Sequence, residues 1–288
     1  MGRSRLLNSL FLVLLFFAGL SSCNFNASIP EYINKNLYHV TYKTIYFQPS
    51  WYQGGQEKGP RGWSYYHPVA GMDRAIAVWK EKNNAASGFG LTFLEDITGP
   101  IPGLSGDTDF IDLSLFPGIY GITGGALTFL GDPYGDSKIV IDYNISSLDS
   151  IFNLSSYTDN FDVYVFENLH FTRTTSTSLL NLTINSGGTV ILKDCFIDGE
   201  IRVPNGSLSL SGNIKIDGEI ILADFMPINV IGTISLDDNR LIKVSYNEPI
   251  YEGMLTLTGD NLAENCGKFE IGDGSTWELD SNGRVKRK

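Results

Sequence analysis

The stretch "LSLSGNIKIDG" at residues 208–218 alternates apolar and polar side chains on both sides of a glycine. Alternation with a period of two is typical of a β-strand that buries one face and exposes the other to water. Gly212 and the pair Asp217–Gly218 interrupt the alternation, and these residue types tolerate the backbone angles of sharp bends. The stretch therefore predicts short strands separated by tight corners.

The same two-strand unit recurs at a nearly constant spacing. Asp-Gly pairs stand at 198–199 and 217–218, a shift of 19 residues, while "GTVIL" at 188 and "GSLSL" at 206 are shifted by 18. Looser copies follow at "GTISL" (232) and "GMLTL" (253). One unit cannot bury its apolar face alone, but stacked units share a continuous apolar column. We therefore predict an all-β solenoid. A Greek-key sandwich is the alternative, and it leaves the matched shifts unexplained.

One segment ahead of these strands has the pattern of a helix, near residues 72–83. Met72, Ile76 and Trp79 recur there at helical spacing, and Asp73 near the start suits the helix dipole. After Gly90 helical patterns nearly vanish, and short β runs follow one another towards the C-terminus. The sequence thus predicts one helix followed by a long array of strands.

This order of elements resembles a known family. A strand in "TIYFQPS", a Gly-rich loop, the helix, "LTFLEDIT" and then "LTFLGDPYGDSKIVID" (127–142) resemble the entry to the right-handed parallel β-helices of the pectin-lyase-like superfamily. The resemblance runs from about Thr44 to near the C-terminus. It implies a single right-handed parallel β-helix over residues 44–288, with the helix near 72–83 as its N-terminal cap. Its motifs specify a fold and not an activity.

The N-terminus has the composition of an export signal. Two arginines within Met1–Arg5 precede the apolar run Leu6–Leu20, which is shorter than the roughly 20 apolar residues of a membrane span. "Leu20-Ser21-Ser22-Cys23" then resembles a bacterial lipobox. That resemblance implies removal of residues 1–22 as a signal peptide and lipidation (palmitate) of Cys23, with residues 23–43 as a flexible tether. Ordinary signal cleavage near Ser22 is the alternative.

Charge and cysteine usage exclude several classes of function. The chain has 21 basic and 32 acidic residues, a formal net charge of −11, and loss of the two N-terminal arginines brings it near −13. A surface this acidic argues against nucleic acid as a partner. Cys195 and Cys266 have no metal-binding spacing, and we expect two separate buried thiols. The three histidines also lack metal spacing, so we expect no metal and no cofactor.

The strongest binding signal is aromatic. Rings with polar tips form platforms for sugars and proteins, although rings that pack over the first strands would give the same pattern. The candidate binding residues, in and around a Gly-rich loop, are Trp51, Tyr52, Trp63, Tyr65 and Tyr66.

Carboxylates for a polysaccharide hydrolase are present, but the family's catalytic segments are not. The best candidates are Asp198, Asp217, Asp237 and Asp238. A hydrolase needs such groups to protonate the leaving oxygen and to activate water, whereas Asp-Gly pairs are also ordinary turn residues. The scattered lysines and arginines offer no base for a lyase, and the acidic surface would repel a polyuronate. We therefore expect no catalytic residues.

These observations together predict a lipid-anchored, non-catalytic β-helix protein of the cell envelope, at the outer membrane or cell surface. Its partners would be the membrane, through the N-terminal lipid, and a glycan or protein ligand. In this it resembles the β-helical surface lipoproteins of bacteria such as spirochaetes or Bacteroidetes. The alternative is a polysaccharide-active enzyme, a glycoside hydrolase or lyase of the same superfamily.

Overall fold

The computed structural model describes residues 44–51, 66–82, 89–98, 125–132, 134–135, 137–142, 150–153, 161–172, 180–223 and 226–288, all within the unit Tyr42–Lys288. These residues are mostly β and contain few helices. The strands are β1 (Thr44–Phe47), β2 (Phe89–Phe93), β3 (Gly125–Leu130), β4 (Ile139–Asp142), β5 (Ser150–Asn153), β6 (Phe161–Glu167), β7 (Leu169–Thr172), β8 (Leu180–Lys193), β9 (Phe196–Ile197), β10 (Gly199–Ile216), β11 (Glu219–Leu222), β12 (Ile228–Leu236), β13 (Ile242–Tyr246), β14 (Leu257–Gly259), β15 (Phe269–Ile271), β16 (Trp277–Leu279) and β17 (Val285–Arg287). The helices are α3 (Met72–Lys82), α4 (Leu262–Asn265) and the 3-10 helices η1 (Pro49–Trp51) and η5 (Cys266–Lys268).

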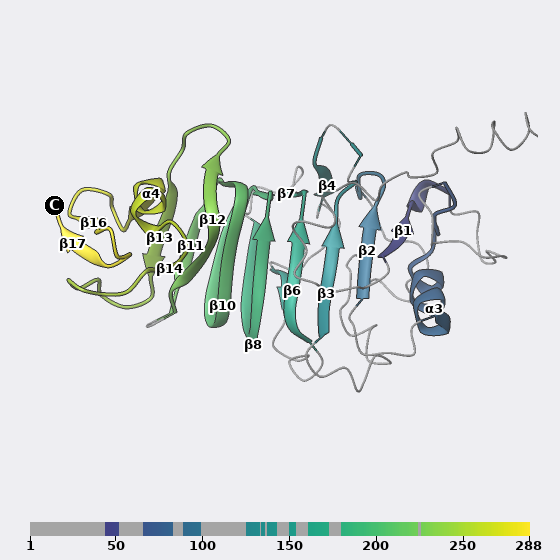
Figure 1. Cartoon of the computed structure of the whole chain (residues 1–288), viewed down its shortest axis with the longest axis horizontal. Coiled ribbons are helices and arrows are strands. Elements are labelled where there is room, and N and C mark those ends of the chain that lie inside the picture. The colour runs from purple at the N-terminus through teal and green to yellow at the C-terminus, as the bar shows by residue number, and fades with distance from the viewer. Residues whose placement is uncertain are drawn as a thin grey trace, which may run out of the picture. The chain divides into compact units, whose positions relative to one another are not determined.

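The strands form three parallel ladders. The first runs through β1, β2, β3, β6, β8, β10, β12 and β14, several of which follow one another across Figure 1. The second joins β5 to β8 and then runs through β10, β11, β13 and β15. The third joins β4, β7, β9 and the end of β10. Because β10 belongs to all three ladders, the sheet curls.

The register confirms the repeat spacing that the sequence predicts for its central units. Ile201 pairs with Ile220, 19 positions later, and Ser207 pairs with Thr189, 18 positions earlier. The all-β expectation is therefore confirmed as a curled sheet of parallel strands.

The two looser copies are wrong in register. Leu208 pairs with Ile228, and Ile228 pairs with Leu257, so "INVI" rather than "GTISL" stacks on "LSLS". The reason is an irregularity in β12: Ser211 pairs with Ile231, but Asn213 pairs with Ser235. Three residues, 232–234, therefore bulge out of the ladder, and a comparison of sequences in fixed register cannot detect them.

The core is a column of apolar side chains at equivalent positions of the first ladder. Its in-register members are Ile45, Leu91, Phe129, Phe166, Leu192, Leu210 and Val230, all buried. Phe129 stacks on Phe93 at 6.2 Å between ring centroids and on Phe166 at 5.4 Å. The alternation in the sequence therefore places one residue in two on the inner side of the sheet, where it meets the same position of the next strand.

The helix that the sequence predicts near residues 72–83 is present as α3, and its buried face joins this core. Met72, Ala75 and Val78 are buried in the same cluster as Ile45 of β1, and α3 contacts β1. Ahead of α3, Val69 bridges to Phe47 of β1 through backbone hydrogen bonds. The residues around the helix therefore bury the inner side of the first strand.

At the C-terminus the parallel pattern gives way to antiparallel pairing. β15 pairs with β16, and β16 pairs with β17, both antiparallel. Trp277 and Leu279 of β16 pack against the core, and Val285 of β17 is buried within it. The segment that begins at Ser275 is therefore a folded hairpin and not a basic tail: Lys286 forms an ion pair with Glu278 at 2.9 Å.

Candidate functional site

Most of the residues with a predicted binding or lipidation role lie outside the described residues. These are Cys23, Tyr52, Trp63, Tyr65 and the side chain of Trp51, whose backbone belongs to η1. Tyr66 is described and is 79% exposed, and His67 beside it is exposed as well. The aromatic binding loop therefore stays a prediction, and Tyr66 meets its requirement of an exposed ring.

The third ladder carries the densest set of chemically active side chains on its outward side. Alternation places Ile141, Phe171 and Ile197 inside, so their neighbours face outward. One outward row is formed by the in-register residues Val140, His170, Phe196 and Lys215, which we call the His170 row. Two residues farther along the strands lie Asp142, Thr172, Asp198 and Asp217, which we call the Asp198 row.

Charged groups of these two rows are bonded to one another or to a neighbouring turn. His170 Nε2 and Asp198 Oδ2 are 2.9 Å apart. Asp217 accepts a hydrogen bond of 2.9 Å from Arg240 Nη1, and Lys215 Nζ lies 3.7 Å from the same carboxylate oxygen.

An aromatic ring lies among these charges. The His170 ring meets the Phe196 ring edge-on at 5.9 Å between centroids. Lys138 Nζ lies 4.5 Å from the Phe196 centroid, over the face of the ring, and also donates to Asp194 O. An ammonium over an aromatic face is held by a cation–π interaction. The two rows together present a half-buried ring surrounded by donors and acceptors.

The electrostatics of Asp198 disfavour a role as a general acid. Partial burial of the carboxyl by itself raises the pKa, but hydrogen bonds from His170 and Thr172, with the nearby positive charge of Lys215, outweigh it, and the pKa is lowered. A glycosidase needs one carboxylic acid that stays protonated near neutral pH, which requires a raised pKa. Asp198 is tuned in the opposite direction.

The structure divides the four candidate carboxylates into two groups. Asp198 and Asp217 lie on either side of Lys215 in the third ladder. Asp237 instead accepts a hydrogen bond of 3.3 Å from Asn213 Nδ2, and Asp238 accepts one of 3.0 Å from the backbone N–H of Arg240. Asp238 is therefore an ordinary turn residue, as the bland reading of these aspartates predicts.

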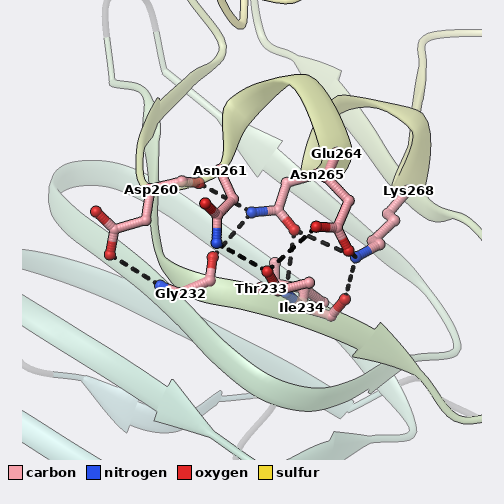
Figure 2. Close-up of polar contacts among 8 residues, drawn as sticks. All are labelled: Gly232, Thr233, Ile234, Asp260, Asn261, Glu264, Asn265 and Lys268. Atoms are coloured by element: carbon pink, nitrogen blue, oxygen red, sulfur yellow. Dashed lines mark hydrogen bonds and ion pairs between the residues drawn. The ribbon is translucent and has the colours of Figure 1, made fainter.

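A second polar cluster, which sequence reasoning missed, surrounds the bulge in β12. Figure 2 shows side chains from α4 and η5 directed at the backbone of Gly232 and Ile234. Asn265, which is fully buried, accepts from Ile234 N–H at 3.0 Å and donates to Gly232 O at 3.0 Å and Asp260 O at 2.9 Å. The only signal in the sequence is the broken alternation at "VIGTI", which does not say which residues bond to it.

Both described cysteines are free and buried, as expected. Burial raises the pKa of the Cys195 thiol to about 12, so this group is unreactive. Within the described ranges, no three side chains of His, Cys, Asp and Glu come together in a way that could hold a metal ion.

Among the same residues, no helix is both long enough and apolar enough to cross a membrane.

Comparisons of this chain with family models, with curated proteins and with solved structures found no match.

Proposed function

We propose that residues 44–288 form one right-handed parallel β-helix. The support is the path of β10, which bonds to β11 at Ile201, to β12 at Leu208 and to β9 at Lys215, as one turn of a helix with three sides would. Connections between parallel strands of one sheet are right-handed in nearly all proteins, which supports the handedness. Partners about 19 positions apart are consistent with one turn per repeat.

The N-terminal cap is part of the same proposal. An uncovered first strand would leave its edge and the end of the apolar column open to water. Val69 bonds to β1, and Met72, Ala75 and Val78 are buried against Ile45. These contacts are those of a cap.

On this scaffold we infer a non-catalytic binding module, held at the bacterial cell envelope by a lipid on Cys23. One observation carries the non-catalytic part: the carboxylates that a hydrolase would use are ion-paired in place, Asp198 with His170 and Asp217 with Arg240. Paired and ionised carboxylates suit a rigid display surface better than proton transfer. The lipobox and polar spacer of the sequence supply the anchor.

The ligand-binding surface of such a module would combine the aromatic loop that ends at Tyr66 with the His170 and Asp198 rows. Tyr66 offers an exposed ring, and the two rows offer Phe196 beside charged groups. Sugars and proteins both bind to surfaces that join an aromatic face to nearby hydrogen-bonding groups.

A panel of polysaccharides and envelope proteins tests this function, with binding and product release scored separately. We expect binding without release of sugar fragments, and weaker binding after Tyr66→Ala. Release of fragments that disappears with Asp198→Asn would overturn the proposal in favour of a polysaccharide-active enzyme. The matched control is Asp238→Asn, because Asp238 only caps a turn.

A further inference from the structure

β12 has one edge that strands cover only in part. On that edge Ile228 to Val230 pair with β14, and beyond Val230 no strand of the described residues continues the pairing. The opposite edge pairs with β10 as far as Leu236. An uncovered strand edge carries N–H and C=O groups that can pair with any extended chain, including another molecule of the same protein.

Side chains occupy this edge in place of a strand. Asp260 Oδ2 accepts from Gly232 N–H at 2.9 Å, and Asn265 Nδ2 donates to Gly232 O at 3.0 Å. Asn265 Oδ1 accepts from Ile234 N–H at 3.0 Å, and Lys268 Nζ donates to Ile234 O. All four backbone groups of Gly232 and Ile234 therefore have side-chain partners (Figure 2).

The amide of Asn265 reproduces the bonding of a strand residue. In a parallel ladder, a residue donates its N–H to the neighbour that precedes its partner and accepts with its C=O from the neighbour that follows. Across Thr233 the Asn265 amide does the same, donating to Gly232 and accepting from Ile234. Its full burial and its third bond, to Asp260 O, fix the amide in this orientation.

We propose that Asp260, Asn265 and Lys268 form an edge plug that prevents β12 from pairing with β12 of a second copy. The strand behind the plug has the properties of a pairing segment: Ile234 is buried while Thr233 and Ser235 are exposed. The same edge of two copies, related by a two-fold axis, would join as antiparallel strands in one continuous sheet. The plug removes the donors and acceptors that such a junction needs.

Sedimentation velocity of the full chain in a non-ionic detergent, over a range of protein concentrations, tests the plug. We expect one species for the wild type and concentration-dependent oligomers for Asn265→Ala. Adding Ser235→Lys, a charge on the opened edge, should restore the single species without restoring thermal stability. Thr233→Ala is the matched control, because the Thr233 side chain contacts only Asn261 and Glu264 around the plug.

Hydrogen exchange distinguishes an opened edge from general destabilisation. In dilute Asn265→Ala the amides of Gly232 and Ile234 should exchange quickly, and protection should return as the protein concentration rises. Asn265→Asp provides the same test if the alanine variant does not fold, because a carboxylate keeps the acceptor but loses both donations. Oligomers in the wild type, or a single species at all concentrations despite fast exchange at Ile234, would overturn the proposal.

Discussion

Single left-handed residues turn the chain at one corner of the sheet. Asn168, Asp194 and Gly212 have φ of 57°, 50° and 68°, and they occupy equivalent positions: Asn168 N–H bonds to Lys193 O, and Asp194 N–H bonds to Ser211 O. Asparagine, aspartate and glycine tolerate this conformation better than other residues. The residue types at corners of the sequence are therefore dictated by backbone geometry.

Gly212→Ala should destabilise the fold. The left-handed conformation costs a residue with a Cβ about 1–2 kcal/mol, and this Cβ would also lie 2.3 Å from Asp194 Oδ1. Urea denaturation should show a loss of at least that size. Gly267→Ala is the matched control, because nothing lies within 4 Å of its Cβ and its φ is not left-handed. Equal stability of the two variants would contradict the corner geometry.

Asp198 should make a pH-dependent contribution to stability. Its pKa in the folded state is lowered from the ordinary 3.8, so the ionised form favours folding. This contribution is fully present above the unfolded pKa and is lost as the pH falls through the folded pKa. The stability difference between the wild type and Asp198→Asn should therefore be constant near neutral pH and shrink below about pH 4. A difference that grows on acidification would contradict the contribution of the His170 contact.

At the scale of elements, the first ladder is held together by identical contacts between neighbouring strands. Phe129 is buried between Phe93 and Phe166, with its ring 9° from parallel to that of Phe166. Aromatic stacking adds about 0.5–1.5 kcal/mol to the burial of each ring. One side chain therefore couples β2, β3 and β6.

Phe129→Ala should lower the free energy of unfolding by about 3–5 kcal/mol, the usual cost of deleting a buried aromatic ring. Phe129→Leu, which keeps most of the volume, should cost clearly less. Leu241→Ala is an exposed control and should change stability by about 0.5 kcal/mol or less. Chemical denaturation followed by circular dichroism measures all three, and similar values for Phe129→Ala and Leu241→Ala would refute the stacked column.

The elements differ in how far sequence predicts them. Alternation and Asp-Gly spacing predict the register around Ile201 and Ser207, because each depends on neighbouring residues and a constant repeat. The bulge at Gly232 breaks that constancy, so the later registers are wrong. The role of Asn265 could not be predicted, because a buried amide satisfying backbone groups 31 residues away leaves no periodic trace. In the candidate site, the pairing of Asp198 with His170 likewise depends on register rather than on any motif.

At the scale of the whole molecule, the charge of −11 is distributed over an outer surface on which ion pairs are frequent. Exposed pairs of this kind contribute little to stability individually. Their effect is to leave few isolated charges, while the acidic excess keeps copies apart. Such a surface is consistent with display at an envelope and with the absence of nucleic acid among the expected partners.

The proposed anchor is tested at the same scale by Cys23→Ser. We expect the wild-type protein to enter the detergent phase on phase separation and the variant to remain in the aqueous phase. Cys195→Ser serves as the control, since that thiol is buried within the sheet. Retention of the Cys23→Ser protein in the detergent phase would show that a lipid on this residue is not the anchor.

The short distance along the chain between ladder partners also governs how the protein can fold. Ile201 meets Ile220, and Ile220 meets Val244, so each new strand bonds to one formed only about two dozen residues earlier. The entropy lost in closing a loop grows only with the logarithm of its length, and here every loop is short. A polypeptide that emerges N-terminus first, from a ribosome or a translocation channel, can therefore add hydrogen bonds in the order in which its residues appear, without waiting for its C-terminus.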